Sequence, residues 1–258
     1  MYLITSFILS IPLTISAIII GYGVQKIIEY SGYEKLPIRA NENDITASYK
    51  EIAINHILLS ILLTLLLPLC QFEWYISFNL LMIMYEIIVG IGMVIIGEFL
   101  GYILNRIYHT NWGYKNIHYR HHLNKNPQSF SDATLATPLD FILIAITSVS
   151  YVLFITQRPI RSAIALGFQA IQMQIIHSGY DIPRLVPYAK SAYEHWIHHQ
   201  DENSNYADYL IIYDKICGTY RSNNDKRSSL LIIAYRYILK KLIILKKIRN
   251  VLLNNEKS

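Results

Sequence analysis

The chain has 258 residues, of which 53% are hydrophobic and only 16% are charged. Its mean hydropathy of +0.27 is too high for an ordinary soluble domain of this length. Lys and Arg outnumber Asp and Glu by 23 to 18. In so apolar a chain this excess is typical of a membrane surface rather than of a nucleic-acid footprint. We therefore expect a membrane protein with no nucleic-acid partner.

Five apolar segments reach or approach the ~20 residues that a helix needs to cross the hydrocarbon core. In chain order they are Leu3–Ile20, Ile52–Leu69, Ile76–Ile96, Leu139–Ile155 and Ile160–Ile176. The first lacks a preceding basic residue and a clear cleavage site, so we interpret it as an anchor rather than a signal peptide. The third is expected to continue as a helix past Glu98. The sequence thus predicts an all-α, polytopic bundle with about four to five spans.

The order of the spans places the third-to-fourth connection and the end of the fifth span on one side of the membrane. The connection carries Arg106, Lys115, Arg120 and Lys125. The turn on the opposite side holds only Arg158 and Arg161. Because positive charge favours the cytosolic side, we expect a histidine-rich helical cap that faces the cytosol.

The C-terminal tail alternates aliphatic and basic residues between Leu230 and Leu253. This pattern is typical of an amphipathic helix that lies in the headgroup layer. A sixth span is the competing interpretation, but its many lysines would be costly inside hydrocarbon.

Six of the nine histidines lie in two short runs of the form HxxHH. The runs are His118, His121 and His122, followed by His195, His198 and His199. If each run is helical, its three imidazoles share one face within a single turn. Imidazole is the commonest protein metal ligand. The two runs therefore predict two three-histidine faces, enough to hold most of a two-metal centre. His56 lies within the second apolar segment, away from these runs, and we expect it to be a packing residue.

Between Glu98 and Tyr220 the chain resembles the fatty acid hydroxylase superfamily, which includes sterol desaturases and sterol C-4 methyl oxidases. The resemblance rests on both HxxHH boxes, on His177 within His177-Ser-Gly-Tyr-Asp-Ile-Pro183, and on Asn205-Tyr206 followed by Tyr213-Asp214-Lys-Ile-Cys-Gly-Thr219. The run that begins at His177 looks most like the sterol C-4 methyl oxidase branch.

The resemblance implies a set of metal ligands and supporting residues. The histidines that it implies as ligands are His109, His118, His121, His122, His177, His195, His198 and His199. At the family's HxxxH box this chain has Asn105 before His109, so Asn105 would be a weak or water-mediated ligand. Glu98 and Asp214 would not bind the metal but would orient its ligands. The alternative for Glu98 is a carboxylate at a helix end at the membrane boundary. The chain also has Thr137-Pro-Leu-Asp140, where many sterol-acting relatives have a histidine before the proline.

The same resemblance implies a membrane-bound di-iron oxygenase that hydroxylates or desaturates a sterol or fatty acyl lipid with dioxygen. Electrons would come from NAD(P)H through a b-type cytochrome or reductase, as a separate partner, and the location would be the endoplasmic reticulum. We divide the chain into transmembrane segments (1–97), a catalytic domain (98–220) and the basic tail (221–258).

Several functions stay open at this point. A sterol C-4 methyl oxidase leads, followed by a sterol C-5 desaturase or a fatty acid or sphingolipid hydroxylase. Asn105 and Thr137 motivate a different alternative, which is a non-catalytic sterol-binding or scaffold homologue.

Overall fold

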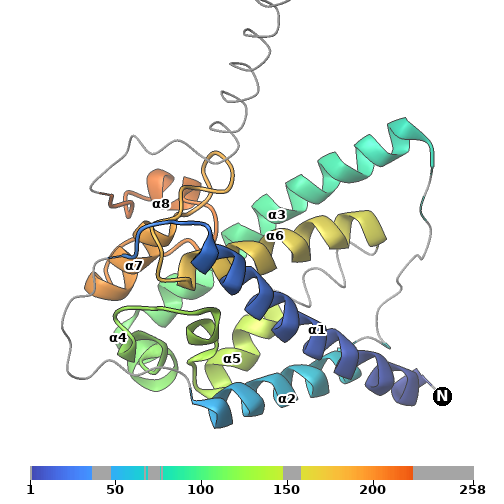
Figure 1. Ribbon diagram of the computed structural model, residues 1–258, viewed down its shortest axis with the longest axis horizontal. Coiled ribbons are helices and arrows are strands. Elements are labelled where there is room, and N and C mark those ends of the chain that lie inside the picture. The colour runs from blue at the N-terminus through green and yellow to red at the C-terminus, as the bar shows by residue number, and fades with distance from the viewer. Residues whose placement is uncertain are drawn as a thin grey trace, which may run out of the picture.

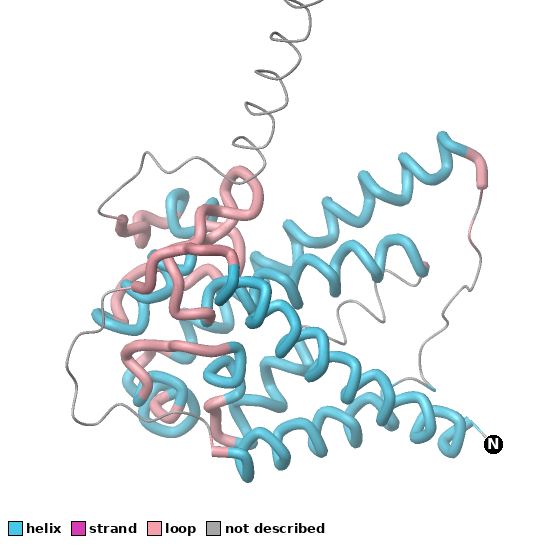
Figure 2. Tube along the Cα trace, in the orientation of Figure 1, coloured by secondary structure: helices cyan, strands magenta, loops and turns pink. Residues whose placement is uncertain are grey.

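The structure is a computed structural model that describes residues 2–36, 48–66, 68, 76, 78–147 and 158–222. Over these residues the chain consists of helices and loops, without strands (Figure 2). The β-type pairing among the residues described is limited to two isolated bridges, Lys35 with Tyr180 and Ala189 with Leu210. The prediction of a helical protein is confirmed for the described part of the chain.

Three long helices begin the fold: α1 (Tyr2–Tyr30), α2 (Tyr49–Leu66) and α3 (Leu80–Tyr108). Each contains a segment long and apolar enough to cross a membrane, and in α1 that segment is Ser10–Tyr30. Their outer faces expose large apolar side chains, such as Ile19 at 65% and Leu81 at 75%. Lipid would cover an exposed apolar surface of this extent. The helical continuation of the third segment past Glu98 is also confirmed, because α3 ends at Tyr108.

The fourth and fifth predicted spans are not among these three. Helix α5 (Pro138–Ala145) covers only the start of the fourth, and residues 148–157 lie outside the described part. Helix α6 (Pro159–His177) coincides with the fifth, but it carries Arg161 and three glutamines. The total of four to five spans therefore stays a prediction. The predicted amphipathic tail also lies outside the described residues.

The long helices pack in pairs, α3 against α6 and α1 against α2 (Figure 1). Gly90 permits the first contact, since a Cβ atom there would lie 3.0 Å from Cδ1 of Ile164. In the second pair Ser10 bonds Thr64 across 2.9 Å, and Ser60 donates to Thr14 across 2.9 Å. Small polar residues of this kind join helices where lipid supplies no hydrophobic driving force.

The shorter elements gather at one end of the long helices (Figure 1). They include α4 (Asn111–Gly113), a π-helical turn (Tyr114–His118), two 3-10 turns (His121–Leu123 and Phe130–Thr134), α7 (Ala192–Asp201) and α8 (Ile212–Ile216). The C-termini of α3 and α6 reach the same end, so His109 and His177 arrive beside both HxxHH boxes.

Candidate metal centre

The eight predicted histidine ligands come together in two groups of four. Group 1 comprises His109, His118, His122 and His198, and group 2 comprises His121, His177, His195 and His199. Within each group the potential ligand nitrogens all lie within 4.8 Å of one another. The groups adjoin, with the ring centroids of His122 and His199 only 4.7 Å apart. Each group could hold a metal ion.

Each HxxHH box contributes to both groups, which corrects the prediction of one face per box. In α7, His195 and His199 belong to group 2 and His198 belongs to group 1. The helix turns ~100° per residue, so positions i and i+4 differ by only ~40°, whereas positions i+3 and i+4 differ by ~100°. The last two histidines of the box therefore point to either side of the first. The same spacing therefore supplies histidines to two groups rather than to one.

The first box is not a regular α-helix. His118 ends the π-helical turn, whereas His121 and His122 lie in a 3-10 turn. The chain reverses sharply before this box at Gly113, where a Cβ atom would lie 2.3 Å from the carbonyl oxygen of Ile107. This tight reversal folds the box back against the end of α3, so the rings of His109 and His122 lie 4.7 Å apart.

Five of the eight imidazoles are oriented through Nδ1. The Nδ1 atom of His118 lies 3.0 Å from Oδ2 of Asp140. Backbone carbonyls play this part for the other four: Leu135 for His121 at 3.1 Å, Met173 for His177 at 3.1 Å, Ser204 for His198 at 2.8 Å and Asn124 for His199 at 2.7 Å. An acceptor at Nδ1 places the proton there and leaves the Nε2 lone pair available. This tautomer is the one that a metal ligand needs.

In group 2 three Nε2 atoms converge closely. The Nε2 atom of His195 lies 2.9 Å from that of His177 and 3.1 Å from that of His199. Because His177 and His199 carry their protons on Nδ1, His195 can donate a proton to only one of them. The nitrogen of the other partner would then have a lone pair with no proton to accept. Nitrogens ~2.1 Å from a shared metal ion would lie about 3.0 to 3.4 Å apart, so this arrangement fits a cation.

Group 1 contains buried nitrogen atoms that the protein does not satisfy. Nε2 of His109, Nε2 of His118 and both ring nitrogens of His122 have no hydrogen-bond partner among the described residues. Buried polar atoms normally find partners, since an unsatisfied one costs about 1–3 kcal/mol. A bound metal ion would satisfy Nε2 of His109 and His118 and one nitrogen of His122.

Burial keeps these imidazoles neutral. The side chains of His122, His198 and His199 are each only 1% exposed. Burial lowers the pKa of His118 to about 3 and the pKa of His121 to about 4. The same effect holds the pKa values of His195, His198 and His199 well below the ordinary range. All of them would therefore be deprotonated ligands at neutral pH.

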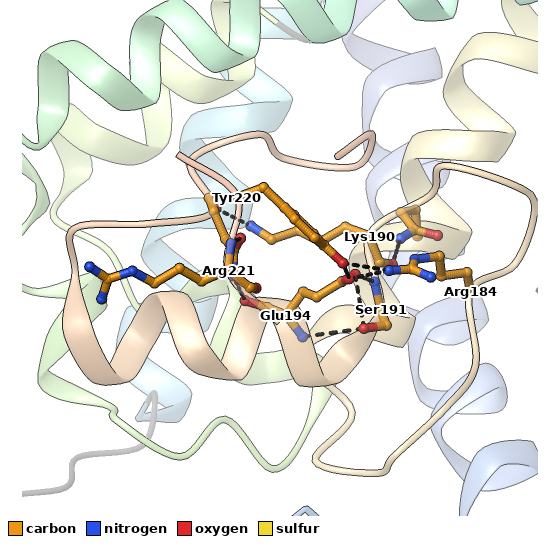
Figure 3. A network of polar contacts seen from close by, with 8 residues as sticks. Arg184, Lys190, Ser191, Glu194, Tyr220 and Arg221 are labelled. Atoms are coloured by element: carbon orange, nitrogen blue, oxygen red, sulfur yellow. Dashed lines mark hydrogen bonds and ion pairs between the residues drawn. The ribbon is translucent and has the colours of Figure 1, made fainter. Parts of the chain in front are cut away.

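A buried polar network holds the N-terminus of α7 (Figure 3). Ser191 and Glu194 form a capping box, in which the Ser191 hydroxyl accepts from the Glu194 amide across 3.2 Å. Glu194 also accepts from Arg184 and from the Tyr220 hydroxyl. Lys190 beside them donates to the carbonyls of Asn205 and Ala207 across 2.6 and 2.7 Å. This network therefore fixes the N-terminus of the helix that carries the second histidine box.

The three other predicted site residues have partners that are not histidines. Glu98 accepts from the backbone amides of Tyr209 and Leu210, both across 2.7 Å. Asp214 accepts from the amides of Tyr206 and Ala207 and from the hydroxyl of Thr219. Both carboxylates therefore fold the segment 205–219 over the centre. The Tyr206 ring of this segment lies 5.1 Å from that of His109.

Asn105 donates through Nδ2 to the carbonyl of Tyr206 across 2.7 Å, while its Oδ1 has no partner among the described residues. Each group has four histidines without it. His56 lies outside both groups, with its Nδ1 at 2.7 Å from the carbonyl of Ile52.

A cavity of about 240 Å³ lies beside the histidines. Its wall is mostly apolar and includes Ile18, Leu104, Phe130, Phe141 and Ile176. Five histidines of the two groups also line it: His118, His121, His177, His195 and His198. An apolar ligand in this cavity would touch the centre directly.

Two acidic residues at the site were not identified from the sequence. Asp140 is the carboxylate partner of His118, and its signal was the acid retained in Thr137-Pro-Leu-Asp140. Asp208 lines the cavity, and burial raises its pKa to about 6. Its position two residues after Tyr206 carries no spacing that would have marked it.

The fold and the site define a helical, membrane-type protein with a double four-histidine centre. The chain belongs to the fatty acid hydroxylase family, whose match covers residues 90–219. No solved structure gives a significant match to it.

The chain is also similar to several curated proteins. It is 31% identical over 152 residues to a Dictyostelium discoideum protein named as a candidate methylsterol monooxygenase, covering 56% of this chain and 57% of that one. It is 27% identical over 147 residues to methylsterol monooxygenase 1 of Rattus norvegicus, covering 54% and 50%. For methylsterol monooxygenase 1-2 of Arabidopsis thaliana the identity is 26% over 132 residues, covering 48% and 44%. The chain thus spans about half the length of these relatives.

Proposed function

We propose that this protein is a membrane-bound di-iron oxygenase that oxidises a sterol or a related lipid. The observation that carries the proposal is the pair of adjacent four-histidine groups, which open on an apolar cavity. The family and the names of the relatives support this choice of reaction class. Among the alternatives, they favour methyl-group oxidation on a sterol over ring desaturation or acyl hydroxylation.

The residues present suit iron. Imidazole binds iron, zinc and copper, but zinc has no redox chemistry. Bound iron would supply the dioxygen chemistry that breaks an unactivated C–H bond. Group 1 would hold one ion and group 2 the other, while Asp140 and the backbone carbonyls keep the imidazoles in the required tautomer. In hydroxylation one oxygen atom enters the product, and the second leaves as water after two electrons and two protons are supplied.

The apolar cavity would orient the lipid and exclude bulk water from the histidines. The three apolar helices support a substrate that enters from the bilayer. The electrons would come from NAD(P)H through a b-type cytochrome or reductase, which is a separate partner. The basic residues near the first box support a cytosolic orientation, and the sterol relatives support the endoplasmic reticulum as the location.

The proposal is tested with the full chain, loaded with iron and placed in lipid nanodiscs. The assay would supply a 4-methylsterol, NADH, cytochrome b5 and its reductase, with products analysed by mass spectrometry. We expect a sterol that has gained one oxygen atom, labelled when ¹⁸O₂ is used. Loss of two hydrogens would instead favour the desaturase, and oxidation of only acyl lipids would favour the fatty acid hydroxylase. No oxidation by an iron-loaded chain would favour the non-catalytic homologue.

A further inference from the structure

The cavity is lined by polar groups that neither the fold nor the eight histidines use. These groups belong to Asn105 and Tyr108 on α3 and to Asp208 in the segment that crosses α3. All three line the cavity together with the histidines. The rest of the wall is mostly apolar, so such groups are costly unless a ligand satisfies them.

The orientation of the Asn105 amide is set by its donor side. Because Nδ2 donates to the carbonyl of Tyr206, Oδ1 is left as an acceptor. The residue is 7% exposed, and this oxygen has no hydrogen-bond partner in the described part of the chain. It is therefore a fixed and unused acceptor.

Tyr108 follows Asn105 by three residues, so it lies on the same face of α3. It is 2% exposed, and its hydroxyl has no hydrogen-bond partner among the described residues. Its ring centroid lies 5.2 Å from that of His118. This places an unused donor next to group 1.

Asp208 makes no hydrogen bond or ion pair within the described residues. The nearby buried cation, Lys190, instead donates to the carbonyls of Asn205 and Ala207. The Asp208 carboxylate packs against Gly101, where a Cβ atom would lie 2.5 Å from its Oδ2 atom. The glycine on α3 therefore leaves the room that this carboxylate occupies.

We propose that Asn105, Tyr108 and Asp208 bind the hydroxyl group of an otherwise apolar lipid alcohol. A hydroxyl both donates and accepts, so it can donate to Asp208 or Asn105 and accept from Tyr108. A ketone would lack the donor, and a hydrocarbon would lack both functions. The alcohol end of the lipid then lies beside group 1, and the carbon that is oxidised lies near that hydroxyl. This assignment rests on the proposed function and adds the polar group that the site recognises.

The test compares the binding of 4-methylcholestanol with that of its methyl ether, which cannot donate a hydrogen bond. Binding is measured on the iron-loaded full chain in nanodiscs under argon, so that no turnover occurs. We expect the ether to bind about tenfold or more weakly, since a hydrogen bond to a charged group contributes about 1.5–3 kcal/mol. In Asp208→Asn the alcohol should lose affinity while the ether does not, so that the preference shrinks. In Tyr108→Phe both ligands should lose affinity, because the ether oxygen still accepts a hydrogen bond from the Tyr108 hydroxyl. Tyr119→Phe, on an exposed tyrosine, is the matched control.

A second pair of variants removes no polar group. Gly101→Ala would push the Asp208 carboxylate aside, whereas Gly92→Ala on the same helix meets nothing within 4 Å. Only the first should reduce the preference for the alcohol, at unchanged iron content.

Equal binding of alcohol and ether by the natural chain would overturn this assignment and leave the proposed function standing. An Asp208→Asn variant that weakens both ligands alike, or a Tyr108→Phe variant that weakens neither, would also overturn it. Binding of neither ligand would overturn the sterol class itself, and the assignment with it.

Discussion

Among single residues, Asp140 differs from the other Nδ1 partners because it is a carboxylate. The remaining four partners are backbone carbonyls, which substitution cannot remove. Asp140 is fully buried, and its Oδ2 atom lies 3.0 Å from Nδ1 of His118. A carboxylate in this position fixes the ring and raises the basicity of the ligand nitrogen. Substitution of Asp140 can therefore test whether an Nδ1 partner supports a histidine of group 1.

We predict that Asp140→Asn weakens the binding of metal to group 1 by roughly 10- to 100-fold. The amide keeps the shape of the side chain but removes its negative charge. Metal affinity is measured by competition with a chelator, and Glu29→Gln, on a partly exposed carboxylate of α1, serves as the control. An unchanged affinity in Asp140→Asn would show that the carboxylate does not support a ligand.

Sequence and structure agree on which histidines come together and differ on what surrounds them. The eight histidines could be predicted because the two boxes share one spacing and the resemblance supplies His109 and His177. The Asp140 partner could not, since it lies 22 residues from His118 and only the tertiary fold brings the two together. Asp208 was missed for the same reason, because it reaches the cavity across Gly101 of α3.

Among the elements, α7 contributes three histidines to the two groups, and the capping box of Ser191 and Glu194 holds its N-terminus. Helix α2 has a matching box, in which the Ser48 hydroxyl accepts from the Glu51 amide across 3.2 Å. The capping box of Ser191 and Glu194 is buried, whereas the capping box of Ser48 and Glu51 is exposed. Among the described residues these two boxes both pair a serine with a glutamate, and of the two only the box of Ser191 and Glu194 lies on a helix with candidate metal ligands.

We predict that Ser191→Ala and Ser48→Ala each cost about 1 kcal/mol of stability, but that only Ser191→Ala lowers metal affinity. Without its cap the first turn of α7 frays, and His195 lies in that turn. Thermal unfolding reports the first effect and chelator competition the second. An equal loss of metal affinity in both variants would show that the cap acts through global stability alone.

The regular helices were predictable to the extent that their sequences are uniformly apolar, as in α2 and α3. The first histidine box was not, because its π-helical and 3-10 turns follow from the close packing at Gly113 and from the Asp140 contact. A spacing of i, i+3 and i+4 indicates which residues cluster. It does not show that the cluster is shared between two groups.

At the scale of the whole molecule, the buried histidines make the metal-free fold sensitive to acid. Their pKa values in the folded chain are lowered, to about 3 for His118 and about 4 for His121, against ~6.5 for an exposed imidazole. Below pH ~6.5 these histidines therefore bind more protons in the unfolded chain than in the folded chain, and their contribution to the free energy of unfolding decreases as the pH falls.

We predict that the metal-free protein has a nearly constant Tm from pH 8 to about 7 and a steadily lower Tm from about pH 6.5 to 5. The loss for each fully buried histidine approaches ~1.4 kcal/mol per pH unit. Bound metal should shift the decline to lower pH, because ligand protonation then competes with metal binding. A Tm that rises or stays level between pH 6.5 and 5 would contradict the burial of neutral histidines.

The proposed di-iron chemistry requires that the two histidine groups hold two metal ions. The decisive measurement is the total iron and zinc content of the detergent-purified full chain, beside that of Asn105→His. We predict about two ions per chain in both, because each group already has four histidines. One ion or fewer in the natural chain, with a gain in Asn105→His, would contradict this account and show that Asn105 disables the site.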